Sequence, residues 1–470
     1  MIEVTPARIA EVTGGRLHHG PGTPVTRVHT DSRTVDGPGV FVALRTPHGD
    51  GHDHVAEAVR RGATAAVVER RTPEAVPQVV VADTWQALQA LAVANRLAVG
   101  PTAVAVTGSV GKTTVKDLAA AAVGAGRRVH AARGSYNNEL GVPLTLLGMG
   151  ADTEVVVAEI GARHPGDIAD LAPMVAPDVA VVTAVAEAHL EAFGSIEVIT
   201  AAKRELVESL GPNGVAVLNV ADHRVASMAA AAPRVIGVAP DDPAADVHAR
   251  DVRLDAAARA TATAVTPWGR AEVRLSIAGR HHLGNALLAI AVAGHLGVDV
   301  VDAAAAISAA TVSPWRSQLR SFDGVHVLDD AYNANPASVI AALDTLEGID
   351  TDGRRIAVLG EMAEIGPSSA AAHTTVGRHC AAAGVDVLVA VGAAGEDLAA
   401  AASDAGVADV RRVPDADAAG AAVAALVRRG DTVLVKASRV VGLEAVTEAL
   451  ARGGTDPGAE TAPADGETPR

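Results

Sequence analysis

The feature that most constrains this chain is a glycine-containing loop between a predicted strand and a predicted helix. The loop has the sequence TGSVGKT, spans residues 107–113 and directly follows the apolar run Ala103–Val106. A helix is expected to follow from about Lys112 to Val123. In a strand–loop–helix unit of this kind, glycines let backbone N–H groups turn inward around an anion, and the helix N-terminus adds a favourable dipole. The segment therefore predicts a phosphate-binding loop.

The residue types of this loop indicate a nucleoside triphosphate. Lys112 supplies a positive charge for the β- and γ-phosphates, and the Thr113 hydroxyl can ligate Mg²⁺. Val106 occupies the place of the first glycine of the general pattern, but the position between strand and helix argues against a merely connecting turn. The residues expected to hold ATP or GTP are Thr107, Gly108, Ser109, Val110, Gly111, Lys112, Thr113 and Thr114.

The rest of the chain predicts an α/β protein. Strands expected at Val155–Glu159 and Val179–Val182 continue an alternation of strand and helix that builds a parallel sheet with helices on both faces. Residues 246–277 alternate between polar and apolar side chains, which predicts a subsidiary antiparallel sheet on this central ATPase domain. A doubly wound, Rossmann-like sheet is expected towards the C-terminus. Its predicted strands are Val325–Leu328, Arg355–Leu359, Val387–Val391 and Thr432–Val435.

Breaks in this pattern suggest three domains and a tail. Pro101 precedes the central strand, and Ser313-Pro314 marks a second boundary because a proline and the residue before it resist helix formation. The last residues are rich in Pro, Gly and Glu and are expected to be disordered. The expected segments are an N-terminal domain over 1–98, a central ATP-binding domain over 99–310, a C-terminal domain over 311–452 and the tail 453–470.

Charge and composition exclude several classes of protein. The chain has 55 acidic and 39 basic residues, and its formal net charge of −16 makes a nucleic-acid partner unexpected. No apolar run reaches the roughly 18 residues of a spanning helix, and the first residues lack the apolar core of a secretory signal. Cys380 is the only cysteine and suits a reducing compartment. We therefore expect a cytoplasmic protein without an integral membrane segment. A monomer is also expected, although nothing in the charge or composition bears on the oligomeric state.

Three polar residues follow the phosphate loop in an informative order. Glu159 ends a predicted strand, where open α/β sheets bind ligands, and could hold the magnesium of a nucleotide. His189 follows the next strand, and Lys203 lies on a predicted helix. Each has an ordinary alternative: a strand-end carboxylate often caps a helix, a lone histidine is often structural, and a helical lysine is often exposed. Only their succession after a phosphate loop favours a site.

The C-terminal half adds further candidates. An arginine at position 316, on a second domain, would act like an arginine finger if domain closure brought it to the γ-phosphate. Asp330 ends a predicted strand and could accept a hydrogen bond from a ribose hydroxyl. It precedes the turn Tyr332–Pro336, which contains Asn333, although turns of this kind are also common loop chemistry.

Taken together, these residues resemble the Mur ligase family of ATP-dependent amide-forming enzymes, and the resemblance extends to about residue 452. The loop, Glu159, His189, Arg316 and Asp330 match the ATP-site residues of the family in order, as does Asn285 in the segment GRHHLGN. Within the family, four segments look like the branch that adds a D-alanyl-D-alanine dipeptide. They are NNELGVP at 137–143, AHLEAFGS at 188–195, DDAYNANP at 329–336 and LGEMAEIG at 359–366.

The resemblance implies a reaction and its cofactors. The terminal carboxylate of a UDP-N-acetylmuramoyl-tripeptide would attack the γ-phosphate of ATP, and the amine of D-Ala-D-Ala would then attack the resulting acyl phosphate. Lys112, Arg316 and two Mg²⁺ ions would stabilise the developing negative charge. The metal ligands would be Thr113, Glu159, His189 and Lys203, the lysine in carbamylated form. Carbamylation requires a neutral amine and hence a lowered lysine pKa.

The same resemblance assigns residues to the other substrate groups. Thr30-Asp31-Ser32-Arg33 matches the N-terminal motif of the family, so Ser32 and Arg33 would hold the UDP end, with Arg33 on the pyrophosphate. Asn137 and Asn138 would face the sugar or peptide, and Asn333 the incoming dipeptide. Arg163 and Ala331 depart from residues that are frequent in relatives, asparagine and serine.

Two other functions remain open at this level. One is a related ligase of the same family that takes a different amine. The other is a nucleotide-dependent switch or binding protein that no longer makes amides, although such a protein would need little beyond the phosphate loop.

Overall fold

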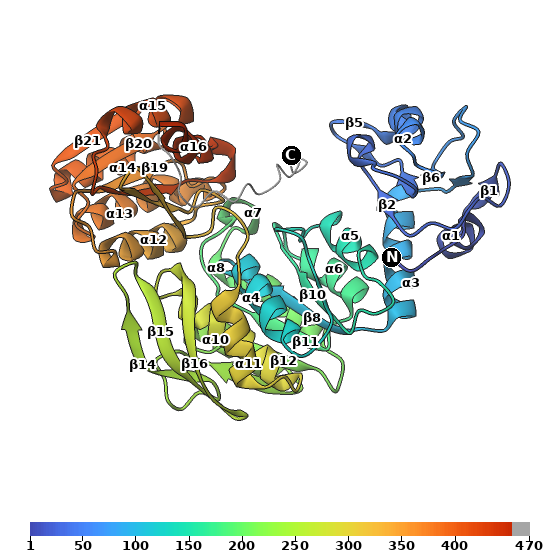
Figure 1. Cartoon of the computed structure of the whole chain (residues 1–470), viewed down its shortest axis with the longest axis horizontal. Coiled ribbons are helices and arrows are strands. Elements are labelled where there is room, and N and C mark those ends of the chain that lie inside the picture. Colours follow the sequence, from blue (N-terminus) through green and yellow to red (C-terminus); the bar gives the residue numbers. More distant parts are fainter. Residues whose placement is uncertain (454–470) are drawn as a thin grey trace.

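The computed structural model describes residues 1–453, so 454–470, nearly all of the expected tail, lie outside the described residues. The described residues form an α/β structure around three sheets that are mostly parallel, with two smaller antiparallel sheets of three and two strands. In Figure 1 the sheet units follow one another along the chain, from the blue N-terminal unit through the green central unit to the orange and red C-terminal unit. The expected fold class is confirmed. Within residues 1–453, no helix combines the length and apolar character needed to cross a membrane.

The N-terminal unit is built on five strands in the order β1-β7-β6-β3-β2, of which only β1 runs antiparallel to its neighbour. Its last helix, α3, packs against α5 and α6 of the next unit and thereby joins the two hydrophobic cores. Its elements are α1 (Pro6–Thr13), β1 (Arg16–His18), β2 (Val28–His29), η1 (Ser32–Thr34), β3 (Val40–Val42), β4 (Arg45–Thr46), β5 (Gly49–Asp50), η2 (Gly51–His54), α2 (Val55–Arg60), β6 (Ala65–Val68), β7 (Gln78–Val80) and α3 (Thr84–Val99).

The central sheet has six parallel strands in the order β13-β12-β11-β8-β10-β9. Strands β10 and β11 are buried along their whole length, as sequences made of valine and alanine up to Glu159 at the end of β10 predict for a sheet covered on both faces. Its elements are β8 (Thr102–Thr107), α4 (Lys112–Gly124), β9 (Val129–Ala131), α5 (Gly141–Leu147), β10 (Val155–Glu159), α6 (Asp167–Val175), β11 (Val179–Val182), α7 (Leu190–Phe193), α8 (Ile196–Glu208), β12 (Val215–Asn219), α9 (His223–Ser227), η3 (Met228–Ala231) and β13 (Val235–Val238).

The predicted subsidiary antiparallel sheet is confirmed. Its three strands pair in the order β14-β15-β16, and alternate residues of β16 are buried, which is the pattern of a sheet with one face on a core. That core is shared with α4 and with the apolar helix α10. The elements of this part are β14 (His248–Leu254), β15 (Arg259–Thr266), β16 (Gly269–Ala278), α10 (His282–His295) and α11 (Val300–Ala309).

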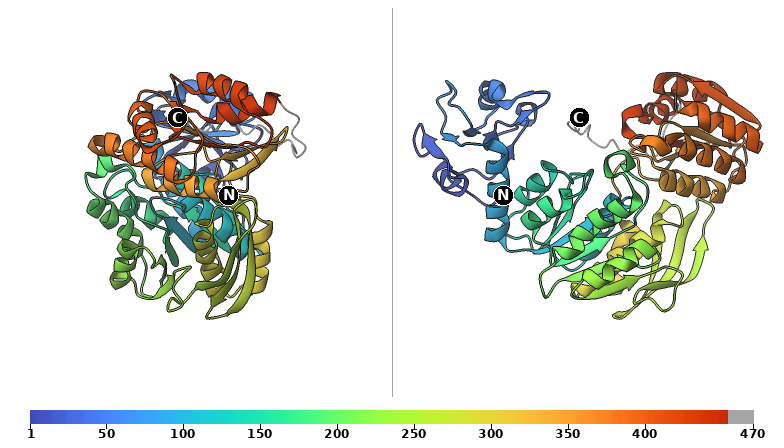
Figure 2. Two further views of the ribbon diagram at one scale, coloured as in Figure 1. Left: turned by 90° about the vertical axis from the view of Figure 1, so that its left-hand side faces the viewer. Right: turned by 180° about the vertical axis from the view of Figure 1, so that it is seen from behind.

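The C-terminal sheet also has six strands, in the order β17-β18-β22-β19-β20-β21, with only β17 antiparallel. The four strands predicted here are all present, and helices cover both faces (Figure 2). The elements are β17 (Gln318–Phe322), β18 (Val325–Asp329), α12 (Pro336–Gly348), β19 (Arg355–Leu359), η4 (Gly366–Ser368), α13 (Ser369–Ala382), β20 (Val387–Val391), α14 (Gly395–Ala405), β21 (Asp409–Val413), α15 (Ala416–Leu426), β22 (Thr432–Lys436), η5 (Arg439–Val441) and α16 (Glu444–Gly453).

Candidate active site

The loop between β8 and α4 needs both of its glycines. Gly108 has a φ of +144°, and a Cβ atom there would lie 2.0 Å from the Thr183 hydroxyl oxygen. Gly111 has a φ of +80°, and a Cβ atom there would lie 2.9 Å from Asn285 Oδ1. The conformation is therefore open only to glycine, and it leaves the loop wrapped around the N-terminus of α4, where an anion is favourably bound.

The segment after β11 supports this loop from the side. The Thr183 hydroxyl lies within hydrogen-bonding distance of the carbonyl oxygens of Thr107 and Val110, and the Ser109 N–H donates to Ala184 O at 2.7 Å. Thr183 and Ala184 directly follow β11, a parallel neighbour of β8 whose carboxyl end lies at the same edge of the sheet. The loop is thus held in place by its surroundings rather than by its own residues alone.

Lys112 begins α4 and folds back over the loop. Its Nζ atom donates to Gly108 O at 3.0 Å. Burial in the cleft lowers the pKa of Lys112, the negative charge of Glu159 opposes this shift, and the positive charge of Arg316 adds to it. An ammonium group placed beside two other charged side chains in this way is suited to hold the phosphates of a nucleotide.

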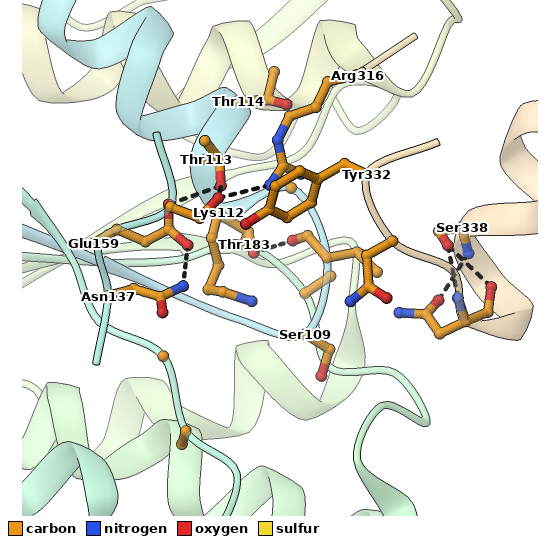
Figure 3. Close-up of a pocket in the computed structure, with 18 of the residues that line it drawn as sticks. Ser109, Lys112, Thr113, Thr114, Asn137, Glu159, Thr183, Arg316, Tyr332 and Ser338 are labelled. Atoms are coloured by element: carbon orange, nitrogen blue, oxygen red, sulfur yellow. Dashed lines mark hydrogen bonds between the residues drawn. The ribbon is translucent and has the colours of Figure 1, made fainter. Parts of the chain in front are cut away.

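Glu159, at the end of β10, is a buried carboxylate with neutral hydrogen-bond partners. It is 1% exposed. One oxygen accepts from the Thr113 hydroxyl at 2.8 Å and the other from the Asn137 amide at 2.6 Å (Figure 3). Glu159 therefore does not cap a helix, and among residues 1–453 no cationic side chain forms a direct ion pair with it. Within residues 1–453 no cluster of three or more His, Cys, Asp or Glu side chains could hold a metal by itself. A carboxylate and a hydroxyl fit Mg²⁺, which is bound through few protein oxygens together with substrate phosphates.

Arg316 approaches Thr113 and Glu159 from the other side of the cleft. Its Nη2 atom donates to Ser135 Oγ at 2.9 Å, and Ser135 Oγ lies 3.0 Å from Thr113 Oγ1. The guanidinium stacks over the Tyr332 ring at 4.2 Å, and its buried Nε atom has no hydrogen-bond partner in the described part of the chain. Figure 3 shows Arg316 and Tyr332 facing Thr113 and Lys112. Arg316 thus contacts Ser135, which bonds to Thr113 of the phosphate loop and lies 181 residues earlier in the sequence.

The backbone around Arg316 is unusual. Trp315 and Ser317, its two neighbours, have φ values of +58° and +48°, which non-glycine residues rarely adopt. The backbone conformation at Ser317 is held by Asp330, whose Oδ1 accepts a hydrogen bond from the Ser317 N–H at 3.0 Å. The other oxygen of Asp330, Oδ2, lies 2.5 Å from Lys436 Nζ. Asp330 therefore lies in the site, where both of its oxygens have protein partners.

These residues line one cleft of about 1030 Å³ between the central and C-terminal units. Tyr332, Asn333 and Lys436 come from the C-terminal unit, and Gln89 is contributed by α3. The lining includes most of the residues expected from the sequence. They are Ser109, Val110, Gly111, Lys112, Thr113, Thr114, Asn137, Asn138, Glu159, His189, Asn285, Arg316, Asp330 and Asn333.

His189 lines the cleft at the start of α7. Its Nδ1 atom forms a short contact with the carboxylate of Glu364, from the C-terminal unit. The backbone supports this contact, because the Glu191 N–H donates to Glu364 O at 3.1 Å. Burial lowers the pKa of His189, the Glu364 charge opposes the shift, and Lys112 adds to it. The other ring nitrogen, Nε2, is the atom left for a ligand.

Lys203, on α8, does not line the cleft but lies close behind it. It is 2% exposed, so it is not the surface lysine of the ordinary alternative, and its Nζ lies 5.7 Å from the centre of the Phe193 ring. Burial lowers the pKa of Lys203 to about 7, and the charge of Lys112 contributes. Near pH 7 a large fraction of the protein molecules therefore carry Lys203 as a neutral amine.

Ser32 and Arg33 lie on the N-terminal unit and do not line the cleft. The Ser32 hydroxyl donates to Glu57 at 2.9 Å, and the Arg33 guanidinium pairs with Asp31 at 2.7 Å. The structure therefore does not bring these two residues together with the phosphate loop. Thr107 and Gly108, at the base of the loop, also lie outside the cleft lining.

Five further residues shape the site, although no role was expected for them from the sequence. They are Ser135, Thr183, Tyr332, Glu364 and Lys436. Thr183 and Lys436 carried a usable signal, because Thr183 follows β11 and Lys436 ends β22 in the way that Glu159 ends β10. Tyr332 and Glu364 lie in the segments 329–336 and 359–366 that carried the family resemblance. The approach of Ser135, Tyr332 and Glu364 to the site depends on the packing of distant segments.

Models of two protein domains match the chain. The Mur ligase middle domain matches residues 106–293, and the domain described as "Mur ligase, glutamate ligase domain" matches residues 315–439. A UDP-N-acetylmuramoyl-tripeptide–D-alanyl-D-alanine ligase of Mycobacterium tuberculosis is 41% identical, over 96% of this chain and 98% of the relative.

Two solved structures give the same result. MurF from Acinetobacter baumannii has a TM-score of 0.85 at 31% identity, covering 96% of this chain and 99% of that one. MurF ligase from Thermotoga maritima in complex with ADP has a TM-score of 0.79 at 29% identity, covering 91% and 97%. Because the two domain matches span most of the chain and relatives align over nearly all of it, this protein belongs to the Mur ligase family.

Proposed function

We propose that this chain joins D-Ala-D-Ala to the terminal carboxyl group of UDP-N-acetylmuramoyl-tripeptide, with cleavage of ATP to ADP and phosphate. The product would be the UDP-linked pentapeptide used in peptidoglycan synthesis. The observation that carries this proposal is the meeting of the phosphate loop, the buried carboxylate of Glu159 and Arg316 of the C-terminal unit around one cleft. The relatives that align over nearly the whole chain, with the same reaction in their names, support the choice of substrates.

The reaction would proceed in two steps. The peptide carboxylate forms a bond to the γ-phosphorus of ATP, and ADP leaves, which gives an acyl phosphate. The amine of the dipeptide then attacks the acyl carbon, phosphate leaves and the amine loses its proton. Both steps develop negative charge on oxygen, which Lys112 and Arg316 are placed to stabilise.

Thr113 and Glu159 would hold one Mg²⁺, and His189 with Lys203 would help to hold a second. Bound Mg²⁺ neutralises charge on phosphate oxygens during transfer. The protein's own part is to present the Thr113 hydroxyl and the Glu159 carboxylate 2.8 Å apart and to keep the carboxylate away from bulk water. Glu364 would orient the His189 ring through Nδ1.

We propose that Lys203 is carbamylated. The neutral amine adds to the carbon of CO₂ and loses a proton, so that a cation is replaced by an anion. The burial of Lys203 and its pKa of about 7 support this, because the neutral amine is available near neutral pH. A positive charge beside Lys112 and His189 would otherwise oppose cation binding.

The remaining groups would bind the two peptide substrates. Ser32 and Arg33 would hold the UDP end on the N-terminal segment 1–98, Asn137 and Asn138 the sugar or peptide, and Asn333 the dipeptide. Since Ser32 and Arg33 do not line the cleft, the substrate would span from one unit to the other. The segments 99–310 and 311–452 would close on it. We further propose that the chain works as a monomer in the cytoplasm, where ATP is available and the single cysteine stays reduced.

The test is phosphate release from ATP with UDP-N-acetylmuramoyl-tripeptide, measured with and without D-Ala-D-Ala and followed by the mass of the product. We expect phosphate release that depends on the dipeptide and a product heavier by one dipeptide. L-Ala-L-Ala is the matched control for the amine, and the Lys112→Met variant is the control for the nucleotide site. Phosphate release that ignores the dipeptide would contradict the proposed substrate.

One observation keeps a different amine as a second candidate. Arg163 and Ala331 depart from the family pattern, and Arg163 lines the cleft. Competing amines offered together with D-Ala-D-Ala would reveal such a preference in the product masses. A nucleotide-binding protein without ligase activity would release no phosphate with any amine, but it would have no need for the grouping of Glu159, His189 and Arg316.

A further inference from the structure

Two neighbouring residues of helix α4, Lys116 and Asp117, form a shielded ion pair beside the phosphate loop. Lys116 Nζ lies 2.5 Å from Asp117 Oδ1, and the two side chains are only 2% and 14% exposed. Neither residue lines the cleft, so the pair is not expected to touch a nucleotide. Because little water competes for either charge, the bonds that the pair makes to other segments hold those segments firmly.

The lysine of this pair holds the segment that leads to Ser135. Its Nζ atom donates to the carbonyl oxygens of Ala132 at 2.7 Å and Gly134 at 3.0 Å. Ser135 is the next residue, and its hydroxyl contacts Thr113 on one side and Arg316 on the other. Lys116 thus fixes the backbone immediately before the group that receives the arginine.

The aspartate holds the segment that leads to Arg316. Its Oδ2 atom accepts two hydrogen bonds from Ser313, one from the backbone N–H at 2.8 Å and one from the hydroxyl at 2.7 Å. Ser313 lies in the connection between α11 and β17, three residues before Arg316. Pro314 follows directly and restricts the backbone at that point. One ion pair on α4 therefore anchors both segments whose side chains meet in the bond between Ser135 and Arg316.

We propose that Asp117, together with Lys116, is a positioning residue that holds Arg316 at the distance needed to grip the terminal phosphate of ATP. Without this anchor the connection would sample more positions, and the arginine would have to give up that freedom on binding. The inference rests on the proposed function only where that function assigns Arg316 to the terminal phosphate.

The test compares binding of ADP with binding of a non-hydrolysable ATP analogue to the full chain by titration calorimetry. Asp117→Asn should weaken binding of the analogue about tenfold, in line with the loss of a charged hydrogen-bond acceptor, and should change binding of ADP less than about twofold. In an Arg316→Ala background, the same substitution should no longer affect the analogue, because the group that Asp117 positions is gone.

The matched control is Asp299→Asn. Asp299 is an exposed carboxylate that likewise accepts two hydrogen bonds, from the backbone N–H groups of Val301 and Asp302 at the start of α11, and it lies outside the cleft. It should leave both affinities unchanged. If Asp117→Asn does not fold, Ser313→Ala removes only the hydroxyl donor and should still weaken the analogue about threefold.

Three results would overturn the inference. They are an equal loss of affinity for ADP and the analogue, a loss that persists in the Arg316→Ala background, and an Arg316→Ala variant that binds the analogue as the wild type does. No peptide or amine is present in this test. A wild type that binds the analogue as described but makes no pentapeptide would refute the proposed function and leave the role of Asp117 standing.

Discussion

Replacing Asp329 with asparagine should stabilise the protein above pH 6. Asp329 ends strand β18 and is 0% exposed. Within residues 1–453, one of its oxygens accepts a long hydrogen bond of 3.4 Å from the Ala331 N–H, and the other accepts no hydrogen bond of ordinary geometry. Burial raises the pKa of this carboxyl group from 3.8 to about 6. The nearby Thr447 hydroxyl opposes the rise in the Asp329 pKa without cancelling it. The folded state therefore holds the Asp329 proton more tightly than the unfolded state does.

The size and direction of the effect follow from proton linkage. Between about pH 4 and pH 6 the unfolded chain releases this proton while the folded chain keeps it, so stability falls as pH rises. The pKa of Asp329 is raised by about two units on folding, which lowers the free energy of unfolding by about 3 kcal/mol above pH 6. About half of this loss is present at pH 5. Asparagine has nearly the same shape and no charge, so Asp329→Asn should remove that penalty.

The assay is thermal unfolding of wild type and Asp329→Asn between pH 5 and pH 8. The Tm of the C-terminal unit should rise by about 10 °C at pH 8, because 1 kcal/mol corresponds to about 2–4 °C in Tm. The rise in Tm should become smaller towards pH 5. Asp404→Asn, on the exposed part of α14, is the matched control and should show no gain. A variant no more stable than the wild type at pH 8, or an equal gain with Asp404→Asn, would refute the reasoning.

Three further substitutions test the site. Ser135→Ala removes the hydroxyl between Arg316 and the phosphate loop and should lower kcat/KM about tenfold in the phosphate-release assay, whereas unchanged kinetics would contradict that role. Lys203→Arg keeps the charge but cannot form a carbamate under the same conditions. It should lower turnover at least about 100-fold with no recovery in bicarbonate, while the wild type should lose activity below pH 7 in CO₂-depleted buffer as the amine is protonated. Glu364→Gln should weaken Mn²⁺ binding about tenfold in equilibrium dialysis because His189 loses its orienting carboxylate, whereas Glu361→Gln in the same loop should not.

The local architecture could be predicted from the sequence because short-range patterns determine it. Short apolar runs specify strands buried on both faces, and the strands at Val155–Glu159 and Arg355–Leu359 agree with their predicted limits. The loop at 107–113 could also be assigned, because its two glycines are required by backbone geometry that recurs wherever a strand leads through such a loop into a helix.

The tertiary structure alone decided the surroundings of the charged residues. Lys203 has the same sequence signature as an exposed helical lysine, and only the packing of α8 makes it buried with a lowered pKa. The contact of His189 with Glu364 joins loops of two different units, and the bond from Arg316 to Ser135 spans 181 residues. A short pattern in the sequence determines the conformation of its own backbone. The burial, pairing and titration of a charge depend instead on which distant segments pack around it.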